Sequence, residues 1–326
     1  MGPLALRLLL LGCLVVLPWV ESNQYWLHVF SLALIAVIVA LGMQLLVGMA
    51  GILSLGQGAF YGVGAYAAAI LAAEWGMPFL LSVLCGGVIA AVTSLLLIPI
   101  VRLKGSSLAV ATLGFGIIAH LVMLNEDWLT GGSIGIIGIR RPILLGFDIG
   151  AERPYYYACL VAAGLTFLAF ERLTQSRFGR ALIAMSQDEE AARASGVAIW
   201  AYKAKCFLIA AFAAGIAGAL YTYHSRYLNP NDFTFQKSID ILIMVVIGGL
   251  GSLPGAALGA AIVVLMPEFL RSSGELRLIL FGILVVVLMG AGNRGLAGLI
   301  AKAAERAKLY RPRQASALSA LRPSEP

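Results

Sequence analysis

The chain has 326 residues, of which 60% are hydrophobic and 12% are charged, and its mean hydropathy is +0.92. A soluble domain carries about 45–50% apolar and about 25% charged residues, so this composition excludes an ordinary soluble enzyme. The net charge is +7, from 23 Lys and Arg against 16 Asp and Glu. Because the basic residues fall between and after the apolar runs, we interpret them as determinants of membrane topology and expect no nucleic-acid partner.

Ten apolar runs follow one another along the chain. A membrane-spanning helix needs about 20 apolar residues, so the runs predict an all-α polytopic membrane protein with about 10 transmembrane helices (8–10), some of them short or broken and rich in Gly. The runs lie near residues 5–20, 27–49, 58–74, 79–101, 106–124, 155–170, 206–225, 239–250, 255–270 and 276–291. The first run also fits a secretory signal cleaved after Ser22, so retention of residues 1–22 stays open.

The distribution of Lys and Arg predicts the orientation of the helices. With ten crossings and the N-terminus inside, the cytoplasmic connections and tail hold 16 basic residues and the opposite side holds 7. Because cytoplasmic loops carry the excess of basic residues, we expect both termini in the cytoplasm. On this topology residues 125–154 face outside and residues 171–205 form a cytoplasmic loop.

Residues 1–301 are expected to form a single transmembrane domain, and residues 302–326 a basic cytoplasmic tail. The tail begins as AKAAERAKLYR and continues into Pro- and Ser-containing sequence, which indicates partial disorder. The four cysteines include no C-x-x-C pair, so neither a disulfide framework nor a zinc site is supported. We expect this chain to bind no metal or cofactor.

The strongest local signal is the stretch SQDEEAARASG at residues 186–196. Ser186 and Glu189 have the spacing of a capping box, in which each side chain satisfies a backbone N–H at the start of a helix. Acidic residues in the first turn and the alanines that follow favour a helix, and Gly196 is placed to end it in a left-handed conformation. The pattern predicts a short helix over 187–196. Helix propensity stabilises so short a helix only a little, so it must be held by contacts with the rest of the protein. The residues of this helix fit two interpretations: a connector between two spans, or a docking element for another protein.

Several segments resemble one family. Glu190-Ala191-Ala192-x-x-x-Gly196 is similar to the E-A-A-x3-G loop with which ABC importer permeases contact their ATPase subunits. The stretches SRFGRALIAMSQDEEAARASGV, KCFLIAAFAAGIAGALY, VVIGGLGSLPGAALGA, LLVGMAGILSLGQGAFYGVGAYAAAIL and TLGFG with LTGGSIGI resemble LivM-type permease subunits of branched-chain amino-acid ABC transporters. The resemblance covers residues 27–300. The general importer pattern continues to Ile-x-Leu-Pro, whereas this chain reads KAKCFLIAA there.

The resemblance implies a permease subunit of the bacterial-type inner membrane, paired with a second permease, two cytoplasmic ATPase subunits and an external binding protein. The contact with the ATPase is then expected at Glu189, Glu190, Ala191, Ala192 and Gly196. None of the six lysines follows a Gly, as the lysine of a phosphate-binding P-loop does, so any ATP hydrolysis belongs to another chain. The resemblance implies branched-chain amino acids as substrates; other amino acids, urea or amides stay open.

The alternative is an ion-coupled secondary carrier that works without ATPase subunits. Such carriers place ionisable residues or broken helices near the membrane midplane. The candidates here are His120, Asp240, Glu268 and Glu74. A lone His is more often a hydrogen-bonded packing residue than a proton relay. The acidic residues fall near predicted helix ends. The pattern therefore disfavours ion coupling. An intramembrane enzyme is set aside, because no H-E-x-x-H, G-x-S-x-G or nucleophile–base pair is present.

Two Gly-rich stretches are candidates for the translocation path. Six glycines fall between residues 48 and 64, and a second group lies at 248–255. Close helix packing explains most such glycines, while a broken segment would expose backbone groups to a zwitterion. The polar residues interleaved with these glycines are the candidate path residues: Ser54, Gln57, Tyr61, Tyr66 and Ser252. The repeated Ser-Leu pair, at 54–55 and 252–253, suggests a weak internal repeat.

Overall fold

The structure, a computed structural model, describes residues 3–273 except 22, 104 and 145, together with 276, 279, 280, 282, 283, 285, 286 and 298. The predicted tail at 302–326, the cleavage site at Ser22 and most of the last apolar run lie outside the described residues. The main helices are α1 (Pro3–Val20), α2 (Gln24–Met43), α3 (Gln57–Ala73), α4 (Phe79–Ser94), α5 (Ser106–Asn125), α6 (Asp127–Thr130), α7 (Glu152–Gln175), α8 (Arg177–Gln187), α9 (Glu189–Ala194), α10 (Ile199–Ser225), α11 (Phe235–Gly248) and α12 (Leu253–Phe269).

Short π- and 3₁₀-helical segments adjoin these α-helices. A π-helix extends α2, and single turns of 3₁₀-helix connect other elements. These segments are the π-helix Gln44–Met49 and the 3₁₀-helices Leu95–Leu97, Ile100–Arg102, Gly132–Ile134, Pro230–Phe233 and Leu270–Ser273.

Five helices are long and apolar enough to cross a membrane, and the described residues are mostly helical, as predicted. The five are Gln24–Met49, Phe79–Leu97, Ser106–Asn125, Glu152–Gln175 and Ile199–Ser225. The helices Gln57–Ala73 and Leu253–Phe269 are apolar but shorter. The total of about 10 spans and the position of the termini stay predictions.

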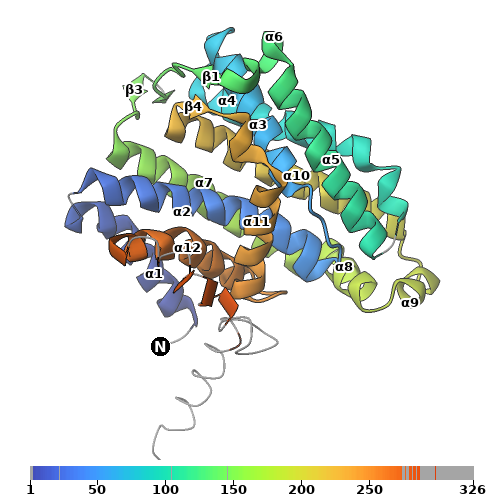
Figure 1. Cartoon of the computed structure of the whole chain (residues 1–326). Helices are drawn as coiled ribbons and strands as arrows, with labels where there is room; N and C mark the ends of the chain where they lie inside the picture. The colour runs from blue at the N-terminus through green and yellow to red at the C-terminus, as the bar shows by residue number, and fades with distance from the viewer. Residues whose placement is uncertain are drawn as a thin grey trace, which may run out of the picture.

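Four strands of two residues each were not predicted. β1 (Ile136–Ile137) pairs antiparallel with β4 (Tyr227–Leu228), and β2 (Ile143–Leu144) pairs antiparallel with β3 (Phe147–Asp148). These strands lie at one end of the molecule, opposite the end that carries α8 and α9 (Figure 1). We call these the strand end and the α9 end.

The predicted loop at 171–205 is almost entirely helical, because α7 continues to Gln175 and α10 begins at Ile199. Hydropathy marks where a helix enters the apolar layer, whereas backbone hydrogen bonding continues past that point. The loop is therefore an extension of two long helices joined by α8 and α9.

α10 lies at the centre of the fold, packed against α2, α3 and α4, while α2 also contacts α7 and α12. Small residues permit this close packing. A Cβ at Gly64 would overlap the backbone of Gly215, and one at Gly218 would overlap the carbonyl of Tyr61. The glycines at these helix crossings therefore act through their size.

Candidate functional site

The short helix α9 begins at Asp188, not at Ser186. The Asp188 side chain accepts hydrogen bonds from the backbone N–H of Glu190 at 2.8 Å and of Ala191 at 3.1 Å. Ser186 belongs to α8, where its hydroxyl donates to the Ile183 carbonyl. The predicted capping box is therefore wrong, and the helix predicted over 187–196 is limited to Glu189–Ala194. Ser186 still lies within α8, whereas the extended backbone of Asp188 (φ −154°, ψ 110°) separates the two helices and lets its carboxylate face the free amides of α9.

The carboxyl of Asp188 is held in its charged form. Hydrogen bonds from the backbone N–H of Ala191 and of Glu190 lower its pKa below the usual value. The charge also lies at the positive end of the α9 dipole.

α9 presents one face to the protein and one to the surroundings. Glu189 forms an ion pair with Lys203 of α10, whose side chain is only 6% exposed, against 26% for Glu189. Ala192 is buried, whereas Glu190 and Ala191 are exposed. Of the residues predicted for ATPase contact, Glu189 and Ala192 therefore anchor α9 to the fold, and Glu190 and Ala191 face outward.

Gly196 ends this element with a φ of +85°, which confirms the predicted left-handed conformation. No described atom lies within 4 Å of the position that a Cβ would occupy there. Gly196 is therefore required for its backbone conformation and not for space.

The end of α8 touches the first Gly-rich break. A Cβ at Gly51 would lie 3.1 Å from the Cβ of Ser186. Gly51 has a φ of +68° and belongs to the non-helical residues 50–56 that follow the π-helix Gln44–Met49. The predicted broken segment is therefore present, and it contacts the element that carries α9.

The π-helix Gln44–Met49, which leads into the first break, contacts the second Gly-rich break inside the fold. Gln44 Nε2 donates to the carbonyl oxygen of Gly249 at 3.3 Å, and a Cβ at Gly48 would lie 2.7 Å from the backbone N of Gly251. Gly249 and Gly251, with φ of 107° and 85°, make the turn between α11 and α12. Segments about 200 residues apart in the sequence thus share one interface of irregular backbone, in which Gln44 and Gly249 are buried and Gly251 is exposed.

Polar side chains satisfy the backbone around the first break. The Thr112 hydroxyl accepts from Leu55 N at 3.0 Å, and the Ser54 hydroxyl accepts from Gly56 N at 3.4 Å. Gln57 Nε2 donates to the Ala210 carbonyl at 2.9 Å. The Oε1 atoms of Gln44 and Gln57 are buried without a hydrogen-bond partner among the described residues.

The structure divides the candidate path residues into separate groups. Ser54 and Gln57 lie in and just after the first break, and Tyr61 and Tyr66 lie further along α3 around Phe233. Ser252 caps α12 by accepting from Gly255 N at 3.1 Å and lies in the second break. The predicted set is therefore not one cluster.

Sequence reasoning missed Gln44, Ser238 and Lys237. Gln44 is a fully buried amide within an apolar run, and that isolation was the available signal. Ser238 accepts from Gly58 N at 2.8 Å, a contact across 180 residues. Nothing in the sequence indicated that pairing.

A polar cluster at the strand end was also not predicted. His28 and His224 stack with ring centroids 3.8 Å apart, and His28 Nδ1 lies 3.5 Å from a carboxylate oxygen of Glu152. A small cavity beside them is lined by Gly150, Glu152, Tyr155, Tyr223, His224 and Arg226.

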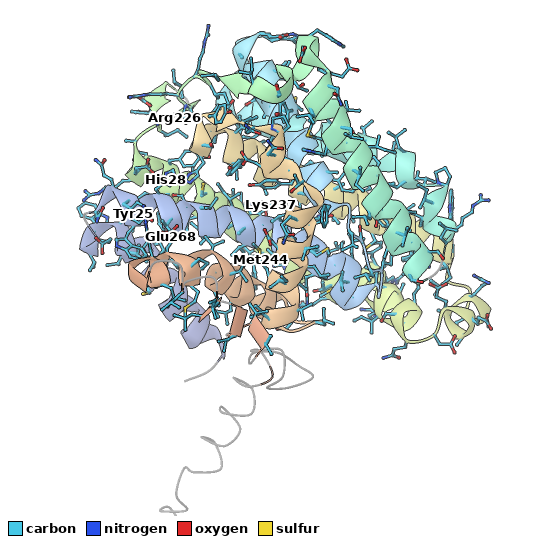
Figure 2. The ribbon with its side chains drawn as sticks, viewed as in Figure 1. Tyr25, His28, Arg226, Lys237, Met244 and Glu268 are labelled. Carbon is cyan, nitrogen blue, oxygen red and sulfur yellow. The ribbon has the colours of Figure 1, made fainter. Side chains whose placement is uncertain are left out.

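Three of the four candidates for ion coupling have local partners, and the fourth, Glu74, is exposed. His120 Nδ1 lies 3.1 Å from the Pro230 carbonyl oxygen, as expected for a packing residue. Asp240 accepts from Gln236 at 3.3 Å. Glu268 accepts from the Tyr25 hydroxyl, and the two residues lie close together between α2 and α12 (Figure 2). Within the described part of the chain, no three His, Cys, Asp or Glu side chains are placed to hold a metal ion.

The similarity of this sequence to known proteins shows the family to which the chain belongs. Residues 25–289 match the family described as "Branched-chain amino acid transport system / permease component". The chain belongs to this family. The high-affinity branched-chain amino acid transport permease LivM of Salmonella typhimurium is 32% identical over 87% of this chain and 73% of its own length. LivM of Escherichia coli is 34% identical over 79% of this chain and 67% of its own length.

A second kind of permease of the same transport system is more distantly similar. The permease LivH of Escherichia coli is 35% identical over 30% of this chain and 33% of its own length. No solved structure matches the chain. The protein is thus a multi-pass ABC transporter permease for amino-acid transport, a class that functions together with other permease subunits.

Proposed function

We propose that the chain is one permease subunit of an ATP-driven importer in the bacterial inner membrane, and that it forms part of the path for branched-chain or related amino acids. Its partners are a second permease, two cytoplasmic ATPase subunits and an external binding protein. The substrate class is taken from the names of the LivM relatives. ATP hydrolysis belongs to the partner subunits.

The observation that carries the proposal is the geometry of α9. The pair Glu189–Lys203 fixes α9 to a central helix, while Glu190 and Ala191 stay exposed. A rigidly mounted surface helix transmits the movement of a partner to the helices behind it. Because the end of α8 contacts Gly51, movement at α9 passes through α8 to the first break.

Uptake of radiolabelled leucine into proteoliposomes tests this function. The complete complex is reconstituted with wild-type chain, Glu190→Lys or Gly196→Pro, and ATP is enclosed on the ATPase side. We expect wild-type uptake to require ATP and both variants to lose it while inserting and assembling normally. ATP-dependent uptake by both variants would contradict the coupling role of α9.

The same vesicles test the alternative of ion coupling. The chain reconstituted without ATPase subunits is given an inward proton or sodium gradient. We expect no gradient-driven leucine flux. Flux under these conditions would replace the ABC importer by a secondary carrier.

A further inference from the structure

Lys237 is a cation placed on aromatic rings. It lies in the first turn of α11, and its Nζ is 5.5 Å from the ring centroid of Tyr61 and 5.9 Å from that of Tyr221. Among the described residues, no carboxylate lies within ion-pair distance of it; Asp232 and Asp240 act on it only at longer range. Figure 2 shows Lys237 on the part of α11 nearer the strand end.

The rings under Lys237 belong to a larger aromatic cluster. Phe233 has its ring centroid 5.7 Å from that of Tyr61, 5.8 Å from Tyr66 and 6.1 Å from Tyr221. Tyr66 is 4% exposed, and its hydroxyl has no hydrogen-bond partner among the described residues. The cluster therefore combines apolar ring faces with a buried polar group that lacks a partner.

Two short helices begin beside Lys237. At 1.5 Å per residue, the 17 residues of α3 and the 14 of α11 extend about 25 and 21 Å, less than the roughly 30 Å of a hydrocarbon core. Their N-termini meet, because Gly58 N donates to Ser238 Oγ at 2.8 Å. A Cβ at Gly58 would lie 3.3 Å from the Cβ of Lys237. The N-termini of such half-helices bind anionic substrate groups in other transporters.

Other cations near helix ends are already engaged. Lys203 forms an ion pair with Glu189, and Arg226 donates to the carbonyl of Gly150. Arg271 donates to the hydroxyl of Tyr25 and lies 3.9 Å from Glu268. Arg271 also lies over the ring of Tyr25, 5.3 Å from its centroid, but it has these polar partners in addition. Lys237 differs because only aromatic faces hold its charge among the described residues, which leaves its N–H donors free for an anion.

We propose that Lys237, at the joined N-termini of α3 and α11, binds the carboxylate of the amino acid in the translocation path. This assignment rests on the proposed function. The aliphatic side chain of the substrate then lies beside the apolar cluster of Tyr61, Tyr221 and Phe233. A charged pair between ammonium and carboxylate fixes the orientation of the substrate at the point where both half-helices begin.

The test compares leucine with leucinamide, which lacks the carboxylate. Equilibrium retention of each tritiated compound is measured on the purified permease–ATPase complex without binding protein. We expect the wild-type complex to retain leucine at least about tenfold more tightly than leucinamide, and Lys237→Gln to lose that preference. Lys237→Arg is expected to keep it. Lys205→Gln is the matched control, since Lys205 also lies over a tyrosine ring, 5.9 Å from Tyr202, but is exposed.

The outcomes separate this assignment from the proposed function. A wild-type complex that retains neither compound, or both equally, overturns the assignment, as does an unchanged preference in Lys237→Gln. ATP-dependent leucine uptake by the wild-type complex, once its binding protein is added, supports the proposed function in either case. If Lys237→Gln fails to assemble, Lys237→Arg decides instead, because loss of the preference in this folded, charged variant also overturns the assignment.

Discussion

The α9 end and the interior breaks of this permease are built in opposite ways. At the α9 end, charged side chains such as Glu190 are exposed, and an ion pair between Glu189 and Lys203 holds the element in place. In and beside the breaks, the side chains of Gln44, Ser54 and Ser238 each form one buried hydrogen bond with the backbone. The comparison teaches that an ion pair between side chains holds the surface helix, whereas the interior breaks depend on side chains that form hydrogen bonds with irregular backbone.

The largest expected effect falls on the packed interior. Gly64→Ala places a methyl group against the backbone of Gly215, which no side-chain movement relieves. We expect a loss of about 3 kcal/mol or more in the free energy of unfolding, seen as a lower melting temperature in detergent. Gly164→Ala is the matched control, because nothing lies within 4 Å of its Cβ position in α7. Equal melting temperatures for the two variants would show that α3 and α10 do not pack this closely.

The next effect concerns the anchor of α9. Glu189→Gln leaves the ammonium of Lys203 buried without its partner, and we expect a loss of about 1–3 kcal/mol, between the values for exposed and buried pairs. Glu190→Gln, on the exposed neighbour, is expected to leave the melting temperature unchanged. If Glu190→Gln lowers the melting temperature as much as Glu189→Gln does, the anchoring role of the Glu189–Lys203 ion pair is contradicted.

A smaller effect on stability, with a larger one on transport, is expected at Gln44. Gln44→Leu removes the hydrogen bond to Gly249, which is worth about 0.6 kcal/mol within a membrane, and also removes a buried oxygen without a partner. The melting temperature should therefore change little while leucine uptake falls, because the π-helix before the first break loses its hydrogen bond to the second break. Uptake equal to that of the wild type would place the functional path elsewhere.

The smallest effect is local to the cap of α9. Asp188→Ala removes the acceptor for the amides of Glu190 and Ala191, so their hydrogen exchange should become faster; Asp188→Asn should retain most of the protection. The pKa of Asp188 is lowered in the folded protein, so its stabilisation is present above the ordinary Asp pKa and is lost as the pH falls through the folded value. Protection factors compared at neutral and acidic pH measure this change.

The sequence was most informative where structure is local. Apolar runs located the long helices, and Gly196 adopts the left-handed conformation that its position implied. The capping assignment failed at Ser186 because two candidate caps stand two residues apart and only the geometry selects Asp188. The junction of Gln44 with Gly249, the Gly58–Ser238 hydrogen bond and the ring cluster under Lys237 depend on how distant helices cross, which no local pattern encodes.

The central claim, that energy enters the permease through the exposed face of α9, is tested most directly by cross-linking. Glu190→Cys is combined with cysteine substitutions on the ATPase surface in the assembled, transporting complex. Leu165→Cys serves as the control, because Leu165 of α7 is itself 64% exposed. The account predicts a cross-link to the ATPase from residue 190 that changes with ATP binding, and none from residue 165. ATP-driven uptake with no cross-link from residue 190 would contradict it.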